Sequence, residues 1–298
     1  MSTATTSIVM SNATDAGFRG WGKWISDQFA AFGWTLVGSV FATGTNWTDV
    51  TAPAAANTAR VTELWRMNDS HQGSAPLFLL IDYGETATAD TPAIRIRLGT
   101  GGSAPTTLSG QFFDSGSTYF GAAAINGANL MTSYASGDAG RISFSMTVSG
   151  TSWATTQQWG WGIERRINSS GASQATGWLF YRYASTSTRG SICFKQDGTN
   201  ALGGTILSSM NFPVVLNAEA NLTFDGKQGI HPMIYCGLGP GESGLNIVTH
   251  PQAAYGAGTT FSVTEFGSSH TYVSMGAVGA VSVLAGSAAA VNPAMRYE

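Results

Sequence analysis

Residues 15–33 read DAGFRGWGKWISDQFAAFG, the clearest helix pattern in a sequence that otherwise favours strands. Large apolar side chains recur in this stretch at steps of three and four residues, which places them along one face of a helix. Thr14 or Asp15 can cap the first turn, and Gly33 suits the left-handed residue that ends many helices. A stripe of this size has to be covered, either by a sheet of the same chain or by a neighbouring subunit. The candidate packing or assembly face consists of Phe18, Trp21, Ile25 and Phe29.

The rest of the sequence reads as short strands separated by turns. Residues 94–98 alternate strictly between apolar residues and arginines, and residues 142–148 alternate between apolar residues and Ser or Thr. Residues 76–83, PLFLLIDY, are apolar on both sides, as in a central strand that is covered on both faces. We therefore predict a mainly β fold, a β-sandwich or jelly-roll-like architecture, with one amphipathic helix near the N-terminus.

Length and composition favour one domain with an unusually uncharged surface. The 298 residues allow two domains or one large β domain, and we expect a single domain over residues 1–298 with a candidate internal boundary near residues 99–110. Only 10% of the residues are charged, against about 25% in an average soluble protein. Such a deficit suits a chain whose surface is covered by partners in an assembly, and it also suits an extracellular adhesin.

Charge and hydropathy argue against several kinds of partner. The formal net charge is −3 and the basic residues are scattered, so we expect no nucleic-acid partner. No basic region followed by a long apolar run opens the sequence, and residues 272–291 are interrupted by Gly, Ser and Asn, so neither a secretory signal nor membrane insertion is expected. Cys193 and Cys236 lie in separate apolar runs and are expected to be free, reduced thiols.

Motifs for metal, phosphate or nucleophilic chemistry are missing from the sequence. The glycine-rich residues 99–103 open no helix and lack a lysine, and residues 239–244 do not form a nucleophile elbow. The histidines have no metal-ligand spacing among themselves or with Cys or Asp: they are His71, His231, His250 and His270. We therefore assign no catalytic residue, no metal and no cofactor.

Acidic residues offer two local pairs, Asp82 with Glu85 and Glu63 with Asp69. A glycosidase needs two carboxylates that face each other across a cleft, about 5 to 10 Å apart. Proximity in sequence does not establish such a cleft, so we expect a protein that is not an enzyme and keep a glycan-cleaving enzyme as an alternative.

An aromatic cluster is the candidate binding surface. Trp159 and Trp161 are two residues apart, so both rings emerge on the same face of a strand, and Trp153 precedes them. Exposed rings with a polar rim bind sugars or partner proteins, whereas covered rings form a core. The candidate ligand-binding aromatics are Trp153, Trp159 and Trp161, and core packing is the alternative role.

Five segments between about residues 17 and 110 read FRGWGKWISDQFAAFGW, TNWTDVTAPAAANTA, ELWRMND, APLFLLIDYG and PAIRIRLGTG, and two further segments near the C-terminus read HTYVSMG and AMRYE. Together they resemble a family of tailed-bacteriophage virion structural proteins. The resemblance implies a non-enzymatic virion component in or attached to the tail or baseplate. Its motifs are aromatic and structural, so it implies no active site and no binding residues.

We therefore expect a virion structural protein that is assembled in the host cytoplasm and contacts copies of itself and other virion proteins. Its contacts should be apolar or made by small residues, and the Gly/Ala-rich residues 277–290 are a candidate contact. The alternatives are a tail protein that binds a host receptor or surface glycan, and a capsid decoration protein.

Overall fold

The computed structural model describes residues 2–10, 15–51, 55, 57–85, 92–117, 119–121, 129–148, 157–167, 173–182, 189–195, 231–232, 247–250, 258–265, 268–274, 280–282, 288–290 and 292–297. Within these ranges the chain is mainly β, with antiparallel sheets and one α-helix near the N-terminus. The predicted fold class is confirmed.

The first sheet, called sheet I, contains strands that follow one another along the chain, with one short additional strand against β5. In spatial order the strands are β2 (Thr35–Phe41), β3 (Val61–Arg66), β4 (Phe78–Glu85), β5 (Pro92–Ser103) and β6 (Thr107–Asp114), and the added strand is β7 (Phe120–Gly121). Ile94, Ile96 and Leu98 of β5 are buried while the arginines between them lie on the opposite face, as the alternation predicts. Because β5 and β6 are the two strands of a hairpin, no domain boundary falls at residues 99–110, and that prediction is wrong.

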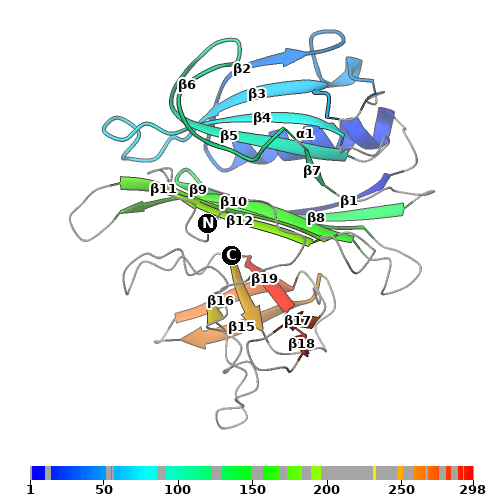
Figure 1. Cartoon of the computed structure of the whole chain (residues 1–298), viewed down its shortest axis with the longest axis vertical. Coiled ribbons are helices and arrows are strands. Elements are labelled where there is room, and N and C mark those ends of the chain that lie inside the picture. Colours follow the sequence, from blue (N-terminus) through cyan, green and yellow to red (C-terminus); the bar gives the residue numbers. More distant parts are fainter. Residues whose placement is uncertain are drawn as a thin grey trace.

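The second sheet, sheet II, joins the N-terminal strand to the middle of the chain (Figure 1). Its spatial order is β1 (Ser2–Met10), β8 (Asn129–Asp138), β9 (Arg141–Val148), β10 (Gln157–Ile167), β11 (Ser173–Arg182) and β12 (Arg189–Lys195). Strands β8 to β12 form a meander, and β1 pairs along its full length with β8, from Ser2 opposite Gly137 to Met10 opposite Asn129.

A smaller sheet, sheet III, lies on the side of sheet II away from sheet I (Figure 1). Its strands are β13 (His231–Pro232), β14 (Ile247–His250), β19 (Asn292–Arg296), β16 (Ser268–Ser274) and β15 (Thr260–Glu265), and a separate hairpin contains β17 (Ala280–Ser282) and β18 (Ala288–Ala290). The ring of Tyr134 on β8 contacts that of Tyr297 just after β19, with centroids 5.7 Å apart. The role of residues 277–290 as a subunit contact stays a prediction.

Helix α1 (Asp15–Ala31) fills the space between sheets I and II (Figure 1). Gly33 adopts a φ of +90°, as predicted for the end of the helix, and the amide of Trp34 donates to the Phe29 carbonyl (2.9 Å). Thr14 and the side chain of Asp15, the predicted caps, lie outside the described residues. The short 3₁₀ helix η1 (Trp47–Asp49) follows β2.

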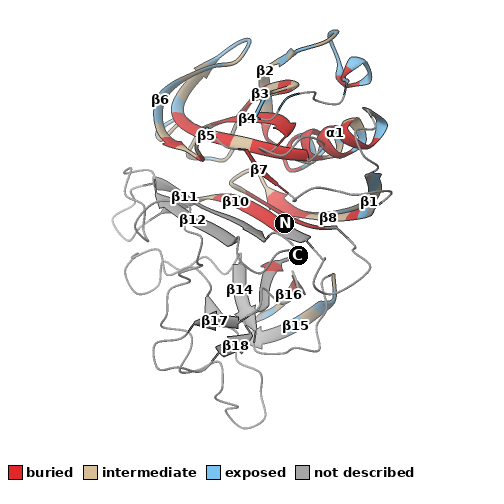
Figure 2. Ribbon diagram, turned by 45° about the vertical axis from the view of Figure 1, so that its right-hand side comes forward, coloured by how far each residue is buried: buried red, intermediate tan, exposed pale blue. Residues whose placement is uncertain are grey.

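The apolar face of α1 contacts both sheets. The Trp21 ring lies 6.1 Å from that of Tyr83 on β4 and 5.6 Å from that of Trp159 on β10. Phe29 stacks on Trp65 of β3 with centroids 5.0 Å apart. Of the two covers considered for the stripe, the structure has the intramolecular one, and Phe18, Trp21, Ile25 and Phe29 are core residues. Figure 2 shows the buried residues concentrated between the two sheets.

Candidate functional site

The predicted ligand-binding aromatics belong to the core where the structure describes them. Trp159 and Trp161 are fully buried on β10. The Trp161 ring packs 4.8 Å from that of Phe144 on β9. Both indoles face the layer that contains α1, so they do not form a surface for a ligand, and the packing alternative replaces the binding assignment. Trp153 lies outside the described residues, as do Cys236 and the side chain of Cys193.

A buried carboxylate lies between α1 and sheet I, at Glu63 of β3, which is 1% exposed. Its Oε1 accepts hydrogen bonds from Ser26 Oγ (2.9 Å) and Trp47 Nε1 (3.1 Å). Its Oε2 accepts from Trp65 Nε1 (2.9 Å) and the Tyr83 hydroxyl (3.1 Å). Both carboxylate oxygens are therefore engaged by donors from the helix, from η1 and from two strands, a group of residues that we call the Glu63 cage.

Burial sets the protonation behaviour of the Glu63 cage. Burial raises the pKa of Glu63, and the four hydrogen bonds, led by that from Trp65, offset this rise only in part. Burial, followed by the charge of Glu63, raises the pKa of Tyr83 well above its ordinary value. The Glu63 cage is closed to solvent, so its role is structural: its hydrogen bonds hold α1 against sheet I.

The outer face of sheet I carries a cluster of charged residues. Asp82 on β4, which is buried, accepts from Thr62 Oγ1 (2.8 Å) and from Arg97 Nη2 (2.5 Å). Arg95 binds Asp114 with two hydrogen bonds, from Nε (3.0 Å) and from Nη2 (2.5 Å). Burial alone would raise the pKa of Asp114, but the hydrogen bonds from Arg95 and Gly116 lower it below its ordinary value. These pairs tie β3 to β6 across the sheet.

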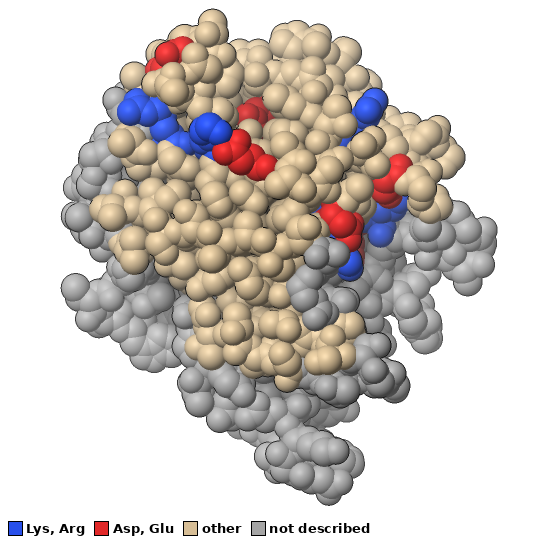
Figure 3. Space-filling model, turned by 180° about the vertical axis from the view of Figure 1, so that it is seen from behind, with Lys and Arg blue, Asp and Glu red and all other residues tan. Residues whose placement is uncertain are grey.

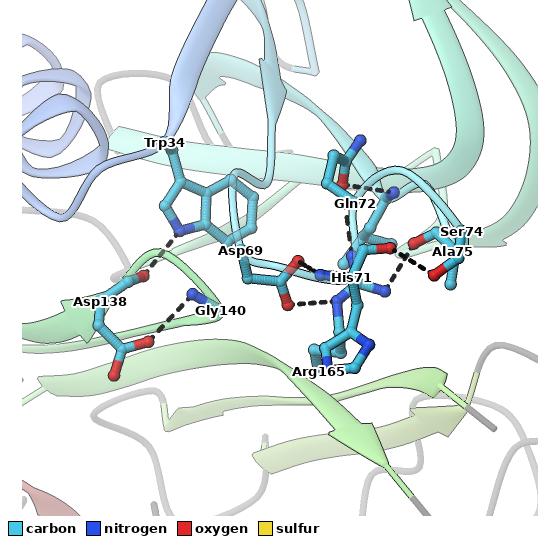
Figure 4. A network of polar contacts seen from close by, with 10 residues as sticks. Trp34, Asp69, His71, Gln72, Ser74, Ala75, Asp138, Gly140 and Arg165 are labelled. Atoms are coloured by element: carbon cyan, nitrogen blue, oxygen red, sulfur yellow. Dashed lines mark hydrogen bonds and ion pairs between the residues drawn. The ribbon is translucent and has the colours of Figure 1, made fainter. Parts of the chain in front are cut away.

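A third polar network fixes the loop between β3 and β4 to sheet II (Figure 4). Arg165 of β10, whose side chain is 2% exposed, donates from Nε to Asp69 (2.5 Å) and from Nη1 to the Ala75 carbonyl (2.6 Å). Its Nη2 donates to Gln72 Oε1 (3.3 Å), which also accepts from the Leu77 amide (3.0 Å). One guanidinium therefore holds three points of a single loop.

The two carboxylate pairs considered for a glycosidase are not brought together. Asp82 and Glu85 are three residues apart on β4 and so point to opposite faces of sheet I. Glu63 is held by its four hydrogen bonds in the core, whereas Asp69, in the loop between β3 and β4, binds Arg165 of β10. Within the described ranges, no group of three or more His, Cys, Asp or Glu side chains could hold a metal ion.

The described surface has few charges, and one sheet edge is free of them. Figure 3 shows a face on which charged side chains form a few small groups of both signs, with a broad uncharged area between them. Strand β1, STATTSIVM, contains no charged residue and lies at the end of sheet II, paired there with β8. Val9 on this strand is 56% exposed, the highest value among the large apolar side chains described. We take the β1 edge as the candidate assembly site.

The sequence indicated part of this edge. The residues TSIVM favour a short strand, whereas the strand has nine residues and begins at Ser2. The β-branched residues Thr3, Thr5 and Thr6 upstream of Ile8 are the signal that would have extended it. For Arg165 no local signal exists, because its partners lie about ninety residues earlier in the chain.

In comparisons with known proteins, no protein-family model matches the chain and no curated protein matches it significantly. Among the described residues, no helix is long and apolar enough to cross a membrane.

Proposed function

We propose that this chain is a non-enzymatic structural protein of a tailed-bacteriophage virion, in or attached to the tail or baseplate, and that it acts by assembly. The observation that carries the proposal is the β1 edge, an uncharged nine-residue strand with one described neighbour. An open edge of this kind is a template for pairing with another chain. The resemblance of residues 17–110 to virion structural proteins is the reason for proposing a tailed-bacteriophage particle.

Two further observations support a structural role. Four charged residues of sheet I bind one another in the pairs Arg97–Asp82 and Arg95–Asp114. The rings considered for glycan binding, Trp159 and Trp161, are core residues. The polar and aromatic side chains described in detail therefore stabilise the fold, which leaves edges and faces of the sheets for contacts.

Immunogold labelling of the purified particles with an antibody against the chain tests the proposal. We expect labelled tails or baseplates and the chain among the proteins of the washed virion. Label over the head alone would favour a capsid decoration protein instead. Absence of the chain from intact particles would overturn the proposal.

A further inference from the structure

The edge strands of this fold differ in how they are protected from pairing. In sheet II, β12 carries Arg189 and Lys195 at its two ends. In sheet I, the pairing of β2 with β3 has a register shift between Leu36 and Gly38, and the tip of the β5–β6 hairpin lies against β2, since a Cβ added to Gly38 would lie 2.2 Å from the Pro105 carbonyl oxygen. Charges, bulges and covering loops are the usual means by which β proteins prevent edge-to-edge association.

Within the part of the chain that the structure describes, the β1 edge has none of these devices. Its nine residues include no charge, no Pro and no Gly, and its register with β8 is unbroken. Alternate backbone N–H and C=O groups of an edge strand point away from the sheet and are available to a further strand. Figure 2 places β1 at the rim of the molecule.

Resting on the proposed function, we propose that β1 pairs antiparallel with β1 of a second copy of this chain, about a two-fold axis at Thr6. Six strands from each copy then form one continuous sheet. In this register residue 3 lies opposite residue 9, residue 4 opposite residue 8 and residue 5 opposite residue 7 of the other copy.

Side-chain size and exposure favour a second copy as the occupant. Residues directly opposite in an antiparallel pair share a face, so the faces of β1 are preserved across the axis. Ala4 and Ile8 are partly buried against the core. In the dimer, Ala4 of each copy lies opposite Ile8 of the other, so a small side chain faces a large one at both positions. Exposed Val9 meets Thr3, and no like charges meet anywhere along the strand.

Paired lysines test this contact, because the double variant Thr5→Lys/Ser7→Lys would place an ammonium group at position 5 directly opposite one at position 7 of the other copy. Like charges directly opposite are destabilising, so we expect the dimer dissociation constant, measured by sedimentation, to rise about ten-fold or more, equivalent to ~1.4 kcal/mol. The control Thr107→Lys/Ser109→Lys makes the same change on exposed positions of β6 and should leave dimerisation unchanged. Equal association of both variants would overturn the proposal.

Disulfide trapping tests the register without relying on the lysine variant. Full-length Thr5→Cys and Ser7→Cys chains are mixed and oxidised, and peptide mass spectrometry is used to look for a bond between positions 5 and 7. We expect this cross-link in the mixture, and no cross-link when Thr5→Cys is mixed with Thr107→Cys. A wild-type chain that stays monomeric up to about 100 µM and forms no cross-link between positions 5 and 7 would overturn the proposal.

The two proposals fail separately. A chain present in the tail with β1 paired to a different protein would retain the proposed function and overturn the self-pairing. If the chain is absent from particles but still forms the cross-link between positions 5 and 7, the self-pairing is retained and the proposed function is overturned.

Discussion

Glu63 receives hydrogen bonds on both carboxylate oxygens, so replacing the carboxylate with an amide should lower the free energy of unfolding. In Glu63→Gln the NH₂ group faces two donors, either Trp65 Nε1 and the Tyr83 hydroxyl or Ser26 Oγ and Trp47 Nε1. A buried polar group left without a partner costs about 1–3 kcal/mol, and we expect a loss of unfolding free energy in this range. Urea denaturation of the variant and of the wild type measures it.

The pH dependence of this loss follows from the raised pKa of Glu63, which burial causes. A folded-state pKa above the ordinary value of 4.5 means that the folded protein binds the proton more tightly than the unfolded chain. The stabilisation is therefore complete below that ordinary value and is lost as the pH rises through the folded pKa. The deficit of Glu63→Gln should be largest in acid and shrink toward neutral pH. The control Asp27→Asn removes an exposed carboxylate, and a deficit that grows with pH would contradict the assignment.

The inward direction of Glu63 was predictable from the sequence, but its partners were not. Val61 and Trp65 alternate with it, so all three share the apolar face of the strand. Two of the donors, Ser26 and Trp47, come from α1 and η1, and strand periodicity does not indicate which helix covers a sheet. The same limit applies to Trp159 and Trp161, whose spacing fits a covered face and an exposed one equally well.

At the scale of elements, two glycines of α1 should respond in opposite ways to the same substitution. A Cβ on Gly20 would lie 3.8 Å from Ile8, an ordinary contact, whereas a Cβ on Gly22 would lie 2.5 Å from the ring of Trp47. That ring cannot move freely because it is buried and donates to Glu63. Gly20→Ala should stabilise the protein by about 0.5–1 kcal/mol through helix propensity. Gly22→Ala should destabilise it by about 1–3 kcal/mol through overpacking.

Thermal denaturation of both variants measures this pair, and each serves as the control for the other. Equal stabilisation by both alanines would mean that Trp47 does not pack on α1 as described.

The side chain of Arg165 contacts three residues of the β3–β4 loop, so Arg165→Lys should loosen this loop. Lysine keeps the charge but cannot reproduce the fork that reaches Asp69, Ala75 and Gln72 together. We expect a loss of about 1–3 kcal/mol and faster hydrogen exchange at the Leu77 amide, which is bonded to Gln72.

The matched control for this loop is Arg141→Lys. Arg141 pairs with Asp138 at the surface, where an ion pair contributes about 1 kcal/mol or less. If both lysine variants leave the exchange of Leu77 unchanged, the guanidinium does not fix the loop.

The elements of the molecule were largely predictable, and their pairing was not. The helix at residues 15–31 and the strand at residues 94–98 follow from periods of 3.6 and 2 residues, which are local. The pairing of β1 with β8 joins residues more than a hundred positions apart, and a period indicates a buried face without naming its neighbour. For this reason the stripe on α1 predicted a cover, by a sheet of the same chain or by a neighbouring subunit, but did not indicate that two sheets would share it.

At the scale of the whole molecule, one core serves both sheets, and Phe29 lies at its centre. Its ring packs against Trp65 of sheet I and against Phe144 and Trp161 of sheet II, with centroids 5.0, 5.8 and 5.9 Å away. Phe29→Ala should cost about 3–5 kcal/mol, because it removes a fully buried ring and leaves a cavity. If sheets I and II unfold as one unit, hydrogen exchange in β4 and in β9 should accelerate by the same factor. Lys23→Ala, on the exposed side of the same helix, should change neither. Loss of protection in one sheet alone would show that sheets I and II do not unfold as one unit.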